Sequence, residues 1–226
     1  MKKNNQLTFI SLFSGAGGFK IGFEEAGFKC LLSSDIEKTS ELTHRKNFKD
    51  SPFLLQDIRT IKTKQILKIT KNQRPDVIIG GPPCQGFSVM GDKNSSDPRN
   101  ELFKSYVALI NDLKPKCFVF ENVKGLSTMY NGQFLEELKN DFSNCGYDIH
   151  FKLINAFDYG VPQLRERVFI VGTKLDKNFD FPKQDKKKFE HLKSFKNATA
   201  LALCAIKLSS ASQNIRPFGN KSIPSL

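Results

Sequence analysis

The sequence has no tryptophan, only three histidines and only three methionines among its 226 residues. Its five cysteines are scattered and form no C-x-x-C pair, and the histidines are equally dispersed. This spacing supports neither a zinc site nor a disulfide framework. The cysteines are Cys30, Cys84, Cys117, Cys145 and Cys204; we expect Cys30, Cys117 and Cys145 to be small buried apolar residues.

Long hydrophobic runs are also missing. No stretch approaches the roughly 18 consecutive apolar residues that a membrane span needs. The segment Met1 to Gln6 is polar and leads directly into a predicted strand, so it lacks the apolar core of a signal peptide. We therefore expect no membrane association and a cytoplasmic protein.

Acidic residues are scarce relative to basic ones. Thirty-five Lys and Arg against 23 Asp and Glu leave a net charge of +12 and a pI near 9.5. A surplus of this size favours a polyanionic partner, with DNA or RNA as the leading candidate. The alternative is a composition that follows AT-rich coding DNA, which also favours Lys, Asn, Ile and Phe.

The C-terminal part differs from the rest, because no acidic residue occurs from His191 to Leu226. The regular pattern of strands and helices ends before a basic run, Lys186 to Lys188. We divide the chain into a domain over residues 1–175 and a basic, poorly patterned tail over 176–226.

Apolar runs alternate with helical periodicity along residues 8–171. We predict strands over 8–12, 30–33, 52–55, 77–79, 117–120, 147–154 and 168–171, and helices over 19–26, 37–46, 61–71, 102–113 and 134–142. Strands that are apolar on both faces predict an α/β fold, with a mostly parallel twisted sheet covered by helices on each side. A ligand site in such a fold lies outside the carboxyl ends of the strands.

A glycine-rich segment, "FSGAGGF", follows the first predicted strand. Its glycines suit a tight turn with close approach of the backbone to a ligand, and Asp35, which closes the next strand, suits ribose hydroxyls. The segment does not have the G-x-G-x-x-G form, so it does not specify NAD, and it is not a P-loop. A tight turn between strand and helix without a ligand is an equally good interpretation.

The segment "GGPPCQGFS" leaves the strand over 77–79. Pro82 and Pro83 stiffen this exit, which would hold the Cys84 thiol in position for nucleophilic chemistry. The alternative is a stiff turn that carries an incidental thiol.

Glu121 and Asn122 follow the next apolar run. A carboxyl group at the end of a buried strand is a candidate for a raised pKa and for proton donation at neutral pH, although it could also cap the following helix. Further on, Gln163, Arg165 and Arg167 alternate along "PQLRER" and so share one face of an extended segment. The guanidiniums suit phosphate or base oxygens, and the alternative is a solvated strand edge.

Taken together, these segments resemble the DNA cytosine-5 methyltransferase family. The matching segments are "FISLFSGAGGFKIGFEEAGF", "GGPPCQGFS", "DPRNELF", "ENV" and "QLRERVFIVG", which occur in the family's order between Leu7 and Gly172. The resemblance implies a Rossmann-like methyltransferase fold, S-adenosyl-L-methionine as cofactor, and double-stranded DNA as partner in a bacterial restriction-modification system.

The resemblance also assigns roles to residues. Cys84 would add to carbon 6 of cytosine, Glu121 would bind and protonate N3, and Arg165 and Arg167 would hold the pyrimidine oxygen and the local backbone. The target base would be flipped out of the duplex. The remaining substrate-binding positions are Gln85, Ser88, Asn122 and Gln163, with Ser88 near phosphate.

For the cofactor, the resemblance implies that Asp35 binds the ribose and that Ile36 packs on the adenine. The family often has an aromatic residue at the position of Ile36, so we expect weaker adenine stacking here. Asp57 and Ile58 would contact the adenine edge, and Pro82 and Leu102 would complete the pocket. The methionine portion would lie along the glycine turn, whose residues are Phe13, Ser14, Gly15, Ala16, Gly17 and Gly18.

The resemblance stops after Gly172. Family members continue into a target-recognition region and two further motifs, and nothing in residues 173–226 resembles these. A split enzyme that needs a second chain for target recognition, a frameshifted or truncated gene, and a trimmed chain are the alternatives, of which we favour a frameshift or truncation. We expect the chain alone not to methylate DNA efficiently.

The same residues also distinguish this chain from other methyltransferase classes. Adenine-N6 and cytosine-N4 enzymes carry Asp, Asn or Ser before the two prolines, whereas this chain has Gly81 there and Cys84 after them. A tRNA cytosine-5 methyltransferase shares the chemistry and remains an alternative, as does a nucleic-acid-binding remnant without activity.

Overall fold

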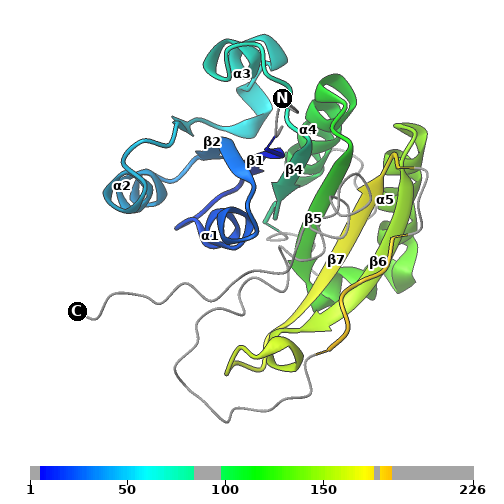
Figure 1. Cartoon of the computed structure of the whole chain (residues 1–226). Coiled ribbons are helices and arrows are strands. Elements are labelled where there is room, and N and C mark those ends of the chain that lie inside the picture. The colour runs from blue at the N-terminus through cyan, green and yellow to red at the C-terminus, as the bar shows by residue number, and fades with distance from the viewer. Residues whose placement is uncertain (1–5, 84–97, 176–178, 185–226) are drawn as a thin grey trace, which may run out of the picture.

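The computed structural model describes residues 6–83, 98–175 and 179–184. Its centre is a seven-stranded sheet with the strand order β3-β2-β1-β4-β5-β7-β6 (Figure 1). Strands β3 to β5 of this order run parallel, whereas β7 is antiparallel to both of its neighbours. The strands are β1 (Thr8–Leu12), β2 (Lys29–Asp35), β3 (Phe53–Leu55), β4 (Val77–Gly80), β5 (Cys117–Val123), β6 (Asp148–Asn155) and β7 (Glu166–Thr173).

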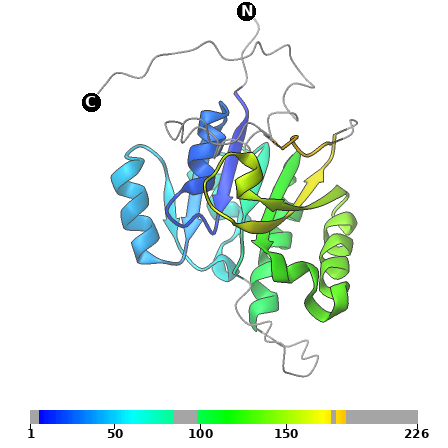
Figure 2. The ribbon, with the colours of Figure 1, turned by 90° about the horizontal axis from the view of Figure 1, so that it is seen from below.

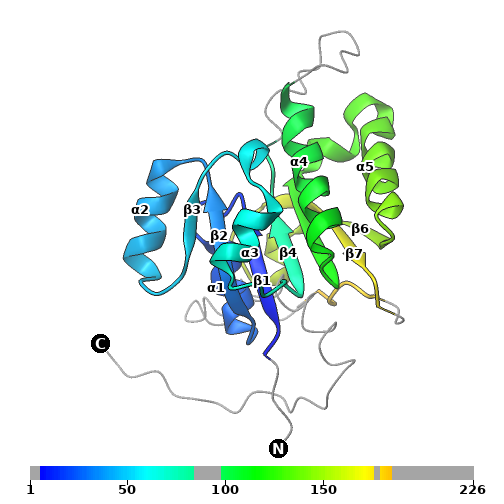
Figure 3. The same ribbon diagram turned by 90° about the horizontal axis from the view of Figure 1, so that it is seen from above.

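Helices cover both faces of the sheet, as Figures 2 and 3 show from opposite sides. The larger core cluster joins one face to α3, α4 and α5, and the smaller one joins the other face to α1. The helices are α1 (Gly18–Glu25), α2 (Lys38–Asn47), α3 (Thr63–Ile69), α4 (Pro98–Leu113) and α5 (Gln133–Asn144); short 3₁₀ turns are η1 (Ile58–Thr60), η2 (Lys124–Ser127), η3 (Met129–Gly132) and η4 (Ala156–Tyr159).

The central strands are buried along their length, which is why they read as continuous apolar runs in the sequence. The predicted α/β class with a mostly parallel sheet is confirmed. Boundaries differ by a few residues: α4 begins at Pro98, four residues before the predicted helix, and α1 ends at Glu25, one residue before the predicted end.

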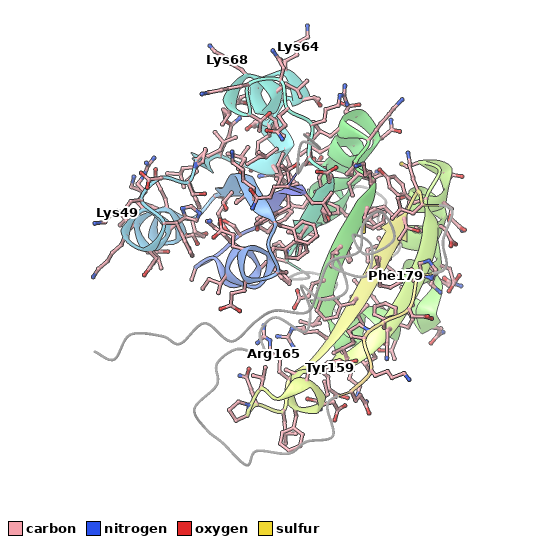
Figure 4. The ribbon with its side chains drawn as sticks, viewed as in Figure 1. Lys49, Lys64, Lys68, Tyr159, Arg165 and Phe179 are labelled. Carbon is pink, nitrogen blue, oxygen red and sulfur yellow. The ribbon has the colours of Figure 1, made fainter. Side chains whose placement is uncertain are left out.

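The segment after β7 packs back onto the sheet. Phe179 is buried in the smaller core cluster, and the hydroxyl of Tyr159 donates a hydrogen bond to the carbonyl oxygen of Pro182 at 3.1 Å (Figure 4). Residues 179–182 therefore pack on the sheet although they follow residue 175, where the sequence pattern predicts the end of the domain. Most of the predicted tail, residues 185–226, lies outside the described residues.

Cys30 and Cys117 are buried and Cys145 is partly buried, as expected of structural thiols. Within the described ranges, none of the helices has the length and apolarity to cross a bilayer.

Candidate functional site

The candidate site lies at the carboxyl edge of the parallel strands. Leu12, at the end of β1, pairs with Ser34 on one side and Gly80 on the other, and Gly80 pairs with Phe120. The segments that follow β1, β2, β4 and β5 consequently meet at one edge. The antiparallel β7 brings its first residues to the same edge, where Arg167 pairs with Val123.

The turn after β1 is built from left-handed backbone conformations. Phe13 and Gly15 both have φ +52°, and Gly17 has φ +96°. The Gly15 N–H donates to Oδ2 of Asp35 at 2.8 Å, and Oδ1 of Asp35 accepts from the Glu37 N–H at 3.0 Å. Asp35 is thus fixed against the glycine turn, with lone pairs left for further donors.

The turn also leaves room for a ligand. A Cβ atom placed on Gly15 or Gly18 would meet nothing within 4 Å. The Ser14 side chain is buried, and its hydroxyl has no hydrogen-bond partner among the described residues. An open cradle beside an unpartnered buried hydroxyl fits a polar ligand on this turn.

The residues expected around an adenine lie on the neighbouring segments. Ile36 is 58% exposed, a large fraction for an isoleucine, whereas Ile58 is buried in the larger core cluster. Pro82 is buried and Leu102 packs against the same cluster. The Ile58 side chain is therefore part of the core, whereas that of Ile36 is open to a ligand.

Asp57 is engaged by a partner that the sequence did not predict. The guanidinium of Arg59 contacts both carboxylate oxygens of Asp57 at 2.5 to 3.1 Å, and these hydrogen bonds lower the pKa of Asp57. The same guanidinium lies 3.8 Å from Glu101 in α4.

Glu121 lies at the end of β5 with its side chain 19% exposed. Its Oε1 atom is 3.1 Å from Nε of Arg167. Burial raises the pKa of Glu121, and the positive charges of Arg167 and Arg165 oppose this effect. A carboxyl group with a raised pKa can hold and donate a proton near neutral pH.

The chain that leaves β4 lies close to the end of β5, where Glu121 and Asn122 are. The nearest approach is at Gly81, where an ideal Cβ would lie 2.8 Å from Oε2 of Glu121. Asn122 donates from Nδ2 to the carbonyl oxygen of Pro82 at 3.0 Å and is 6% exposed. Behind them, the Tyr106 ring fills the space beside Gly80, and its hydroxyl donates to the carbonyl oxygen of Val119.

Arg165 and Gln163 precede β7 and are exposed, and Figure 4 labels Arg165. The Arg165 N–H donates to Oδ1 of Asn155 at 3.2 Å, which fixes its main chain. The three remaining predicted positions, Cys84, Gln85 and Ser88, lie outside the described residues. The part of the chain that the structure describes brings no three potential metal ligands together.

The family model for "C-5 cytosine-specific DNA methylase" matches residues 7–217. The chain belongs to this family. Its members take their methyl group from S-adenosyl-L-methionine, and the open glycine turn with Asp35 beside it fits that nucleoside donor.

Individual relatives agree with the family match. The chain is 45% identical to the Type II methyltransferase M1.HphI of Haemophilus parahaemolyticus over 78% of this chain and 48% of that protein. It is 42% identical to the Type II methyltransferase M.AquIA of Picosynechococcus over 76% of this chain and 74% of that protein. The chain thus spans about half the length of M1.HphI, and the same holds for M.FnuDI of Fusobacterium nucleatum.

A solved structure also matches. A prophage-encoded E. coli protein, described as a DNA modification methyltransferase, superposes with a TM-score of 0.69 at 34% identity, covering 80% of this chain and 51% of that one. The Schizosaccharomyces pombe Dnmt2 methyltransferase, with a TM-score of 0.61 at 20% identity, shares the fold.

Proposed function

We propose that this chain carries the cofactor-binding and base-modifying half of a DNA cytosine-5 methyltransferase of restriction-modification type. The observation that carries the proposal is the partly buried Glu121, which lies against Gly81 and Arg167 at the sheet edge that also holds the glycine turn. The chain spans about half of several relatives, and the proposal concerns the chemistry on cytosine.

In this proposal, S-adenosyl-L-methionine supplies an electrophilic methyl group when bound. Asp35, fixed by the N–H groups of Gly15 and Glu37, accepts hydrogen bonds from the ribose hydroxyls. Ile36, exposed beside it, packs on the adenine. Asp57 accepts from the adenine amino group, for which it must share its oxygens with Arg59.

Cytosine carbon 5 is a poor nucleophile, so the ring must first be activated. The thiolate of Cys84 adds to carbon 6, and protonated Glu121 hydrogen-bonds to N3 and gives it a proton as negative charge develops there. Carbon 5 then takes the methyl group. The methyl donor is left as its neutral thioether, S-adenosylhomocysteine. Loss of the carbon-5 proton to a base, with return of the N3 proton to Glu121, then expels the Cys84 thiolate and restores the aromatic ring.

The arginines on β7 complete the site. Arg167 contacts Glu121 directly and keeps its carboxyl group aimed at the edge, and Arg165 places a second positive charge nearby. We assign to them the cytosine oxygen and the adjacent phosphate, which suit guanidinium donors. Flipping the base out of double-stranded DNA brings carbon 6 within reach of Cys84. Gln85, Ser88, Asn122 and Gln163 would then contact the DNA.

The test measures cofactor binding and methyl transfer separately. Calorimetry with S-adenosylhomocysteine should show binding that Asp35→Ala weakens. Tritiated methyl transfer is then measured on unmethylated duplex DNA and on tRNA, with Cys84→Ser as the matched control. Transfer to DNA that Cys84→Ser abolishes supports the proposal.

Each other outcome points elsewhere. Transfer to tRNA alone would make the chain a tRNA cytosine-5 methyltransferase. Cofactor binding without efficient transfer to either substrate would agree with the expectation that the chain alone does not methylate DNA efficiently, and would favour a form that needs a partner chain for target recognition. Absence of cofactor binding would overturn the proposal.

A further inference from the structure

Phe48 follows the C-terminal end of α2 and packs beneath the glycine turn. Its ring atoms Cε2 and Cζ lie 2.6 and 3.0 Å from the position that a Cβ would take on Gly17. By contrast, a Cβ on Gly15 or Gly18 would meet nothing within 4 Å. The turn is therefore open at Gly15 and Gly18, where the cofactor could lie, and closed at Gly17 by the Phe48 ring.

The ring is itself held by charged and aromatic neighbours. The Lys20 ammonium lies over the Phe48 ring at 4.5 Å from its centroid, and Lys20 is 2% exposed. An ion pair with Glu24, one turn along α1, holds this ammonium in place. The His44 ring also lies 4.8 Å from the Phe48 ring, centroid to centroid. A desolvated cation over an aromatic face is a favourable contact, so the Lys20 ammonium helps to fix the position of the Phe48 ring.

We propose that Phe48 is a positioning residue for the methyl donor, acting through Gly17. This inference rests on the proposed function, because it takes the glycine turn as the cofactor site. The Gly15–Asp35 hydrogen bond fixes the turn on one side, and the Phe48 ring supports it on the other. Phe48 thereby sets the left-handed conformation at Gly17 and the placement of the unpartnered Ser14 hydroxyl.

The first experiment compares Phe48→Leu with Phe53→Leu in the full chain. Phe53 is also half-buried and its ring also lies 4.8 Å from that of His44, so it is a matched control for lost aromatic packing. We expect Phe48→Leu to raise the Kd for S-adenosylhomocysteine about tenfold and Phe53→Leu less than about twofold, at similar melting temperatures. Equal effects on Kd would overturn the inference.

The second experiment is a double-mutant cycle that a purely structural role would not satisfy. Gly17→Ala is strained in any background because φ is +96°, but with Phe48 present it also drives a methyl group into the ring. We expect Gly17→Ala to weaken cofactor binding several-fold less in a Phe48→Ala background than in the wild-type chain. Additive effects on Kd would contradict the inference.

For DNA methylation, Phe48→Leu should raise KM for S-adenosylmethionine and leave kcat at saturation within about twofold, as expected for a cofactor-binding effect. An unchanged KM with a reduced kcat would count against the inference. If the wild-type chain fails to bind S-adenosylhomocysteine, the proposed function itself is refuted. If it binds, but Phe48→Leu and Phe53→Leu change the Kd equally, only the role of Phe48 is refuted.

Discussion

Gly81→Ala should slow methyl transfer with little loss of folding stability, because Gly81 lies against the candidate catalytic carboxyl group of Glu121. The added Cβ would lie 2.8 Å from Oε2 of Glu121 and 3.4 Å from its carbonyl oxygen. The first distance is too short for a carbon–oxygen contact, so the carboxyl end must move by about half an ångström, which disturbs its 3.1 Å contact with Arg167.

The cost to folding should be small, since the group that moves is the end of a side chain; we expect less than about 1 kcal/mol of unfolding free energy. A misplacement of this size at a reacting group can cost on the order of 10- to 100-fold in rate. We therefore expect single-turnover methyl transfer, with the chain in excess over DNA, to slow by about that factor.

Gly125→Ala is the matched control, because a Cβ there would meet nothing within 4 Å and the residue has no positive φ. It should change neither the rate nor the denaturant midpoint noticeably. If Gly81→Ala methylated DNA at the wild-type rate, the placement of Glu121 in the reaction would be refuted.

Further changes test other parts of the structure. Asn122→Ala removes the donor to the buried carbonyl oxygen of Pro82, so urea denaturation should show a loss of about 1 to 3 kcal/mol; an unchanged midpoint would mean that this contact does not hold the loop. Gly172→Ala would place a Cβ 2.0 Å from the Phe118 ring in the core, and we expect a drop in thermal midpoint with a loss of about 1 to 3 kcal/mol. Burial lowers the pKa of His44 from 6.5 to about 4. Between pH 6.5 and pH 4, His44 is therefore protonated in the unfolded chain but neutral in the folded chain. Stability should therefore fall as pH drops from about 6.5 to 4, by roughly 2 kcal/mol at pH 5. In His44→Leu this part of the acid-side loss should be absent, and a His44→Leu profile parallel to wild type would contradict the assignment.

The sequence predicted the existence of nearly every strand and helix, because apolar runs and helical periodicity reflect burial directly. It also indicated that the segments after β1, β2, β4 and β5 meet at one edge, which follows from parallel pairing. These predictions depend on local pattern and on one general rule for α/β sheets.

Strand direction and order could not be predicted in the same way. The run that became β7 reads like any other apolar run, yet it enters the sheet antiparallel between β5 and β6. This insertion brings Arg167 to Glu121. From charge and spacing alone, Arg165 and Arg167 could equally have formed a solvated strand edge.

Contacts between distant segments were missed for a similar reason. Two aromatic rings pack where a glycine far away in the chain has no Cβ: Phe48 lies against Gly17, and Tyr106 lies against Gly80. The glycines were noticed for their backbone freedom, whereas the structure shows that two of them also make room for an aromatic ring. The Arg59–Asp57 pair lies only two residues apart and could have been suspected from charge alone.

The most direct test of the account is covalent trapping on DNA that contains 5-fluorocytosine, with S-adenosyl-L-methionine present. Fluorine at carbon 5 cannot leave as a proton does, so the enzyme should remain attached through carbon 6. Intact-mass spectrometry and peptide mapping should locate the adduct on Cys84, and Glu121→Gln should slow its formation. An adduct on another residue, or an adduct that forms equally well in Cys84→Ser, would contradict the account.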